Sequence, residues 1–286
     1  AYTCFGRHWV LTLQEVDVSG LIREKVYPDR DGLIFTAATL CYRETFDSFR
    51  RIVGLDHPIA PAGPDTASKP ALEAVLPSPF DPGALAVGVP SGTVNGGFHN
   101  KAAWLEAVVD LLPELVHDNR GRTLVLFASY ADLEAVAARI EAPLAVAGYP
   151  LLVQRKGGPT VTLCDDFRTI KESVLLGVDT FWYGVDFKGD TLTQVIITRI
   201  PYPSPADPLQ MARQRADNKA YWERYHYDTY IKLHQGVGRL IRSETDRGRV
   251  LFLDTRIQSR GLYKQLNHAN RAANRRCSTG IGTPVP

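Results

Sequence analysis

The chain has 286 residues, 44% of them hydrophobic, and its 33 Lys and Arg residues nearly balance 31 Asp and Glu residues. Length allows one or two domains with a sizeable core. A net charge of +2 neither requires nor excludes a nucleic-acid partner, so any positive surface must be local.

Membrane and metal functions find no support in the composition. No apolar run reaches the roughly 20 residues of a membrane span, so no membrane partner is expected. The four cysteines are Cys4, Cys41, Cys164 and Cys277. They have neither zinc nor iron–sulfur spacing, which predicts a reducing, cytoplasmic compartment and no metal bound by this chain.

The first 40 residues predict a strand, a short helix and a second strand. Residues 8–13 are bulky and β-branched, and residues 32–36 form a short apolar run typical of a buried strand. Between residues 57 and 100 the composition shifts to Pro, Gly, Ser and Asn. That shift indicates a long ordered loop or linker.

A regular alternation of elements follows from Lys101, where a helix is expected. Apolar runs predict buried strands at residues 123–127, 151–153, 195–197 and 249–254. Apolar residues at helical spacing predict one helix after Ser129, a second that includes Phe167, Ile170 and Val174, and a long helical stretch over residues 207–243. Short apolar strands alternating with amphipathic helices imply an α/β fold with a parallel sheet covered on both faces. Ligands of such sheets gather beyond the carboxyl ends of the strands.

Residues 228–248 read DTYIKLHQGVGRLIRSETDRG. On a helix, Gln235, Arg239 and Arg242 would project within about 60° of one another, opposite an apolar face. An amide and two guanidinium groups would then share one surface. The alternative interpretation is an exposed basic helix face paired with acidic neighbours.

Two features of this segment disfavour a purely structural helix. Arginines three residues apart repel each other, and the interior Gly236 and Gly238 each cost roughly 1 kcal/mol relative to alanine. An anionic ligand resolves the conflict, because guanidinium groups match phosphate oxygens and glycine allows another surface to approach closely.

The string QGVGRLIR at residues 235–242 resembles motif VI of superfamily 2 helicases, and Asp254-Thr255-Arg256 matches the DinG/XPD branch. The resemblance implies a RecA-like second helicase domain whose motif VI faces ATP held by the first domain. It assigns Arg242 as an arginine finger, Arg239 as a second phosphate or interdomain contact, and Gln235 to orienting water or phosphate. Gly238 joins the ATP-binding residues on the same grounds.

The string FWYGVDF at residues 181–187 resembles motif V. By resemblance, Asp186 contacts the nucleotide ribose, Gly184 permits close backbone approach, and Phe181 and Trp182 contact DNA. Tyr183 stands where the family usually has Glu, which puts in doubt any coupling role of that acid. The alternative for Phe181 and Trp182 is ordinary core packing.

Two weaker resemblances complete the order of motifs. Residues 126–130 (LFASY) resemble motif IV, which implies that Ser129 and Tyr130 approach the nucleic-acid backbone; a capped helix start is the alternative. Residues 35–40 (FTAATL) resemble motif III, with Ala37 replacing Ser, and assign Thr39 to DNA binding.

The resemblance covers only half of a motor. Neither a G-x-x-x-x-G-K-[ST] phosphate loop nor an Asp-Glu-x-His box is present. We therefore expect this chain to be inactive alone, with ATP and Mg²⁺ bound mainly by the first helicase domain. The expected divisions are the end of that first domain (1–40), a connecting segment (41–100), the RecA-like domain (101–257) and a tail (258–286).

The resemblance implies movement 5′→3′ on single-stranded DNA, with the first helicase domain of the same parent chain as a further partner. Interleaved cations and rings at residues 213–230 suit a single strand, although the rings could instead pack inward. CRISPR-associated type IV DinG proteins are one divergent branch, which adds a CRISPR ribonucleoprotein as an expected partner. Two alternatives stay open: a non-catalytic degenerate binding module, and a different nucleotide-handling enzyme such as a kinase or nucleotidyl transferase.

Overall fold

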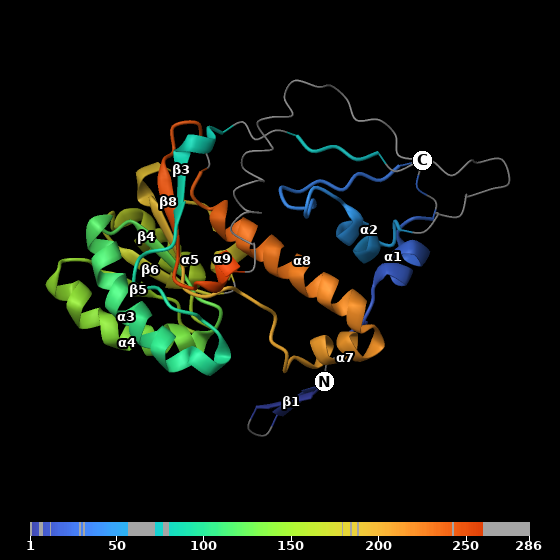
Figure 1. Cartoon of the computed structure of the whole chain (residues 1–286), viewed down its shortest axis with the longest axis horizontal. Coiled ribbons are helices and arrows are strands. Elements are labelled where there is room, and N and C mark those ends of the chain that lie inside the picture. Colours follow the sequence, from blue (N-terminus) through green and yellow to red (C-terminus); the bar gives the residue numbers. More distant parts are fainter. Residues whose placement is uncertain are drawn as a thin grey trace. The chain divides into compact units, whose positions relative to one another are not determined.

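The computed structural model describes residues 2–5, 8–11, 13–28, 30, 32–56, 72–76, 80–178, 180–183, 185–187, 189–241 and 243–259. These residues form two compact units (Figure 1). The smaller unit takes its described residues from 1–75 and 202–231, and the larger from 76–201 and 232–259. These divisions differ from the boundaries expected from the sequence. None of the helices in the described part has the length and hydropathy of a membrane-spanning segment.

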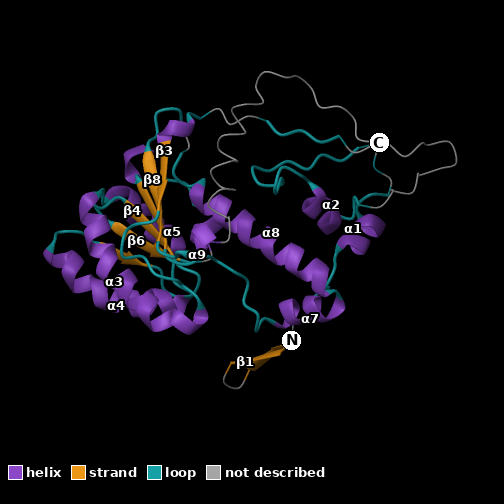
Figure 2. Cartoon of the chain, viewed as in Figure 1, coloured by secondary structure: helices purple, strands orange, loops and turns teal. Residues whose placement is uncertain are grey.

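The larger unit is built on a six-stranded parallel sheet (Figure 2) in the order β3-β8-β7-β4-β6-β5. Its strands are β3 (Leu85–Gly88), β4 (Thr123–Leu126), β5 (Leu151–Val153), β6 (Val174–Gly177), β7 (Gln194–Ile197) and β8 (Gly248–Phe252). All residues of β4, β6 and β7 are buried, as expected for central parallel strands covered on both faces. The sheet confirms the α/β, RecA-like fold class.

One face of this sheet is covered by α3 (Lys101–Asp118) and α4 (Tyr130–Val146), which lie side by side in Figure 1. Val125, Leu176 and Ile196 point from the sheet into their shared core. On the other face, Leu126 lies against Gly236 near the end of α8. The remaining elements of the unit are α5 (Thr160–Thr169), α6 (Thr180–Tyr183), α9 (Arg256–Ser259) and the 3-10 turns η1 (Pro82–Ala84), η2 (Phe98–Asn100) and η3 (Gly189–Thr191).

Two strands of the sheet were not predicted. β3 lies in the segment expected to be a loop, yet Leu85 pairs with Gly248 at the start of β8. The helix expected to include Val174 is wrong there, because α5 ends at Thr169 and Val174 begins β6. A short apolar run fits a buried strand and a buried helix equally well by periodicity alone.

The single helix predicted over residues 207–243 is also wrong. The segment divides into α7 (Pro208–Ala216) and α8 (Asn218–Val237), separated by Asp217 in an extended conformation. The Asp217 carboxylate accepts the backbone N–H groups of Lys219 and Ala220, at 2.9 and 3.0 Å, and so caps the new helix.

The smaller unit contains the antiparallel pair β1 (Tyr2–Phe5) and β2 (His8–Leu11), the helices α1 (Ser19–Lys25), α2 (Asp47–Val53) and α7, and α8 through Ile231. Its buried apolar residues are Tyr27, Tyr42, Val53, Tyr221, Tyr227 and Tyr230. The strand predicted at residues 32–36 does not form, and Ile34 is 91% exposed. Among the described residues, no strand pairs with residues 32–36.

Candidate nucleotide and nucleic-acid site

Ser129 caps α4 directly beyond the carboxyl end of β4. Its extended backbone (φ −150°, ψ 152°) lets Oγ accept the N–H of Asp132 at 3.2 Å. The hydroxyl proton remains a donor, and both Ser129 and Tyr130 are partly exposed. These two residues therefore lie beyond the carboxyl end of a parallel strand, the edge at which ligands of such sheets generally bind.

The short helix α6 follows the end of β6 and inserts its rings into the protein. Phe181 and Trp182 are fully buried, and the indole N–H of Trp182 donates to the main-chain oxygen of Phe127 at 2.9 Å. Phe181 lies so close to Gly177 that an added Cβ there would come within 2.6 Å of its ring. Neither ring presents a face to a nucleobase, whereas Tyr183 is 54% exposed.

The loop between β6 and α6 is fixed by a buried amide. Gln154 accepts the Val178 N–H at 2.7 Å and donates to the Thr180 hydroxyl at 3.2 Å. Asp186, expected to contact the ribose, has an exposed side chain, and its main-chain oxygen accepts from Arg168 at 3.2 Å. Gly184 lies outside the described residues.

Arg239 is buried, although the sequence predicted a phosphate-facing helix position. Because α8 ends at Val237, Gln235 and Arg239 do not share the helical face expected for them. The Arg239 guanidinium donates to the main-chain oxygens of Trp182, at 2.7 and 3.2 Å, and of Val185. It thereby joins the segment after α8 to the segment after β6. Arg242 lies outside the described residues.

The last turn of α8 carries the other residues expected from motif VI. The N–H of Gly238 bonds to the oxygen of His234 at 2.9 Å, which closes the helix end. An added Cβ at Gly236 would lie 3.0 Å from the Trp182 ring, so the surface that requires this glycine is the protein's own. The side-chain oxygen of Gln235 is buried and accepts no hydrogen bond among the described residues.

A cation lies over the rings of the motif V segment. The ammonium nitrogen of Lys232 is 5.3 Å from the ring centroid of Trp182 and 5.7 Å from that of Tyr183. Both distances fit cation–π attraction. The position that departs from the family pattern therefore contributes a ring to this contact.

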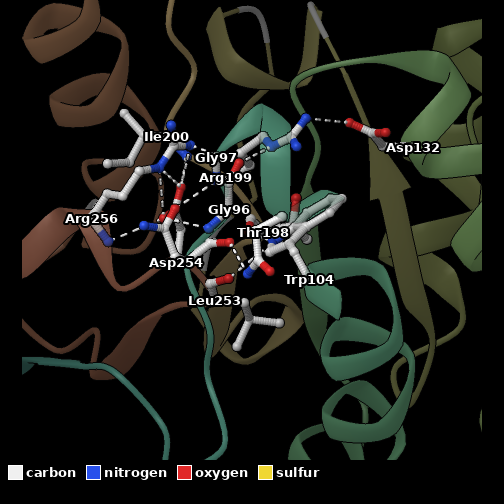
Figure 3. A network of polar contacts seen from close by, with 12 residues as sticks. Gly96, Gly97, Trp104, Asp132, Thr198, Arg199, Ile200, Leu253, Asp254 and Arg256 are labelled. Carbon is white, nitrogen blue, oxygen red and sulfur yellow. Dashed lines mark hydrogen bonds and ion pairs between the residues drawn. The ribbon is translucent and has the colours of Figure 1, made fainter. Parts of the chain in front are cut away.

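A polar network lies beyond the ends of β7 and β8 (Figure 3), and the sequence analysis did not predict it. Asp254 is 1% exposed and accepts the backbone N–H groups of Gly96 and Ile200 at 3.0 and 3.1 Å. Arg256 Nη2 forms an ion pair with Oδ2 of Asp254 at 2.7 Å. Burial by itself would raise the pKa of Asp254, but Arg256 and the two N–H groups together hold that pKa below its usual value.

Arg199 extends the network to α4 (Figure 3). It donates to the oxygen of Gly96 at 2.7 Å and to Asp132 at 3.2 Å, with its guanidinium 4.5 Å from the centroid of Trp104. Lys101 also pairs with Asp132 at 2.8 Å. The start of α4, which carries Ser129, is thus tied to the ends of two other strands.

Trp104 lies in α3, the helix expected from Lys101, and also belongs to this network. Its indole N–H is shared between the main-chain oxygens of Thr198, at 2.8 Å, and Leu253, at 3.1 Å. The sequence held one signal for this network, the string Asp254-Thr255-Arg256, in which an acid and a base lie two residues apart and can pair.

Thr39, expected to bind DNA, is buried in the smaller unit. Among the described residues, no cluster of His, Cys, Asp or Glu is arranged to hold a metal ion.

A family model described as the helicase C-terminal domain matches residues 112–272. The ATP-dependent DNA helicase YoaA of Escherichia coli (strain K12) is 30% identical over 268 residues, covering 91% of this chain and 38% of that protein. The 3′-5′ exonuclease DinG of Bacillus subtilis (strain 168) is 28% identical over 255 residues, covering 87% and 26%. The chain therefore spans less than two fifths of either relative.

The solved structures add support for the fold. A structure of an XPD helicase superposes with a TM-score of 0.52 and 22% sequence identity, covering 67% of this chain and 35% of that one. At this identity the likeness concerns the architecture alone.

Proposed function

Because this chain belongs to the helicase C-terminal domain family, in its DinG and XPD branch, we propose that it is the second motor domain of an ATP-dependent DNA helicase. The observation that carries the proposal is the side-chain oxygen of Gln235, a buried acceptor without a donor among the described residues. An unsatisfied buried polar group costs about 1–3 kcal/mol. A ligand that supplies a donor would remove that cost.

Water bound beside the nucleotide would supply such a donor. In this proposal the Gln235 oxygen accepts a hydrogen bond from the attacking water, and the amide nitrogen can donate to a phosphate oxygen. Arg242 acts as the arginine finger, offsetting the negative charge that develops on the γ-phosphate oxygens. Asp186, with its exposed carboxylate, takes the ribose.

Arg239 has a different part in this proposal. Its guanidinium already bonds main-chain oxygens at Trp182 and Val185. We therefore assign it as a positioning residue that holds the segment carrying Asp186, in place of the phosphate contact that the resemblance implies. The exposed ring of that segment is Tyr183, so it would take the DNA contact expected of Phe181 and Trp182.

The first helicase domain supplies what this chain lacks. A phosphate loop and a magnesium-binding acidic box are absent from the sequence, so ATP and Mg²⁺ would be held mainly by that domain. Supporting a partner domain, Leu33, Ile34 and Phe35 are 44%, 91% and 39% exposed. Such a run is suited to burial against further structure. Movement 5′→3′ and a link to CRISPR ribonucleoprotein complexes stay predictions.

The test is ATP hydrolysis by the full-length protein that contains this chain, with and without single-stranded DNA, beside the 286-residue chain alone. We expect DNA to stimulate the full-length protein and the chain alone to be silent. Arg242→Ala should reduce kcat at least about a hundredfold while ATP affinity stays within roughly tenfold, because a finger acts mainly in the transition state. Wild-type turnover in this variant would contradict the assignment. A silent full-length protein that still binds DNA would favour the non-catalytic binding module.

A further inference from the structure

The rings of α8 within the smaller unit fall into two sets. Tyr221, Tyr227 and Tyr230 are buried, and the rings of Tyr42 and Tyr230 have centroids 5.0 Å apart. Trp222, by contrast, is 44% exposed. The sequence left open whether the rings of this segment pack inward. The rings of the three tyrosines do, whereas the ring of Trp222 does not.

Trp222 belongs to a cluster of four neighbouring rings at the surface, which we call the Trp222 cluster: Tyr202, Trp222, Tyr225 and His226. Tyr202 and Tyr225 are stacked, with centroids 5.3 Å apart and planes 10° from parallel. The Tyr225 ring meets Trp222 at 5.2 Å and 71°, edge to face. His226 supports Trp222 from one helical turn ahead, at 6.1 Å. These contacts hold the indole in place, so a ligand would pay little to order it.

Two cations close to Trp222 in the sequence are unpaired among the described residues, whereas the acids of the same segment are engaged. The exposed side chains of Lys219, one turn before Trp222, and Arg215 form no ion pair among the described residues. The nearby acids are engaged: Glu223 pairs with Arg51, and Asp228 pairs with Arg224 at 2.7 Å. Asp217 is occupied as the cap of α8. A ligand with a flat face and a negative charge would complement this surface.

We propose that the Trp222 cluster is a stacking site for an unpaired nucleobase of a nucleic-acid strand, with Lys219 and Arg215 contacting the flanking phosphates. This inference rests on the proposed DNA partner, and it adds a site in the smaller unit built from residues that belong to none of the motif segments. Nucleobases stack on aromatic side chains with little sequence preference, since every base has a π-face. A protein partner would require a larger apolar surface than one exposed indole.

The test measures binding of a labelled single-stranded oligonucleotide to the 286-residue chain without ATP, by fluorescence anisotropy and by tryptophan emission. Of the four tryptophans, Trp104 and Trp182 are fully buried, and Trp222→Phe separates the signal of Trp222 from that of Trp9. Base stacking on Trp222 should quench emission, and the variant should abolish that quench. Trp222→Ala should weaken binding about tenfold. The matched control is Phe98→Ala, which removes an 83% exposed ring outside the cluster and should leave affinity unchanged.

Two further measurements do not depend on the folding of the ring variants. An oligonucleotide with abasic sites should bind more weakly than the normal strand and should not quench. Lys219→Ala should lower the slope of log affinity against log salt by about one, as for loss of one phosphate contact. Equal affinity of wild type and Trp222→Ala, with no quench, would overturn the stacking site while DNA-stimulated ATP hydrolysis could still stand. Failure of the chain to bind single strands would overturn it as well.

Discussion

The guanidinium of Arg239 donates two hydrogen bonds to the main-chain oxygen of Trp182, from Nη2 at 2.7 Å and from Nε at 3.2 Å. A third bond from the same side chain reaches Val185. One planar side chain thus fixes a loop that lies more than fifty residues earlier in the chain. The geometry requires a fork of donors, which arginine has and lysine lacks.

Arg239→Lys should therefore destabilise the larger unit although the charge is kept. Leaving buried carbonyl oxygens without donors costs about 1–3 kcal/mol each, so we expect the unfolding free energy to fall by about 2 kcal/mol. Urea denaturation of the chain would measure it. The control is Arg155→Lys, an exposed position expected to stay within about 0.5 kcal/mol of wild type. An unchanged midpoint for Arg239→Lys would contradict the buried role.

Gly96→Ala should disturb the network of Asp254. An added Cβ at Gly96 would lie 2.7 Å from the carboxylate of Asp254, closer than such atoms pack. That carboxylate is held by hydrogen bonds from Gly96, Ile200 and Arg256, so it cannot move away without losing them. We expect a loss of about 1–3 kcal/mol, typical of overpacking, seen in thermal unfolding. Gly32→Ala meets nothing within 4 Å and serves as the control. Equal melting temperatures of the two variants would argue against the close approach.

The Asp254 carboxyl should make stability depend on acid pH. Its pKa in the folded protein is below the unfolded value of about 3.9, so the folded state favours the ionised form. This contribution is fully present above about pH 3.9 and is lost as the pH falls through the folded pKa. Asp254→Asn should flatten that acid limb in a series of urea titrations. A wild-type slope in the variant would show that other carboxyls carry it.

His234 should produce a second pH dependence in a different range. Burial lowers the pKa of His234 below the usual value of about 6.5, so the folded state binds its proton less readily than the unfolded chain. The unfolding free energy should then decrease as the pH falls below about 6.5 and level off under the folded pKa. His234→Gln should remove this decrease below about pH 6.5 while leaving the Asp254 limb in place. If the unfolding free energies of wild type and variant change with pH in the same way over this range, His234 is not held neutral in the folded protein.

Two central strands, β4 and β7, could be predicted from their apolar pattern, whereas the equally buried β6 was taken for part of a helix. β4 and β7 are buried on both faces, so each appears in the sequence as an uninterrupted apolar run between polar turns. The position of Ser129 followed directly, since its cap marks the end of one strand and the start of a helix. The order of the strands in the sheet and the hydrogen bonds from Trp104 to residues distant in the sequence produce no such local pattern.

The chemistry of Arg239 could not be predicted because it depended on where α8 ends. A helical projection that continues past Val237 places Arg239 beside Gln235, whereas the real turn after Gly238 directs it at Trp182. The rings of Phe181 and Trp182 show the same limit in another form. The sequence pattern of a motif is the same whether its aromatic residues face a ligand or fill the core. Only the packing of the folded protein distinguishes the two.

The pairing of β3 with β8 has a practical consequence for handling the protein. β3 contributes only four residues, from a stretch whose composition suggests a dispensable linker, yet it covers one side of β8. A shortened chain that begins at Lys101 would leave β8 with a bare row of main-chain donors and acceptors. Exposed strand edges of this kind recruit strands from other molecules, so this chain should aggregate more than one that begins just before Phe80, which also lacks residues 1–75 but keeps β3.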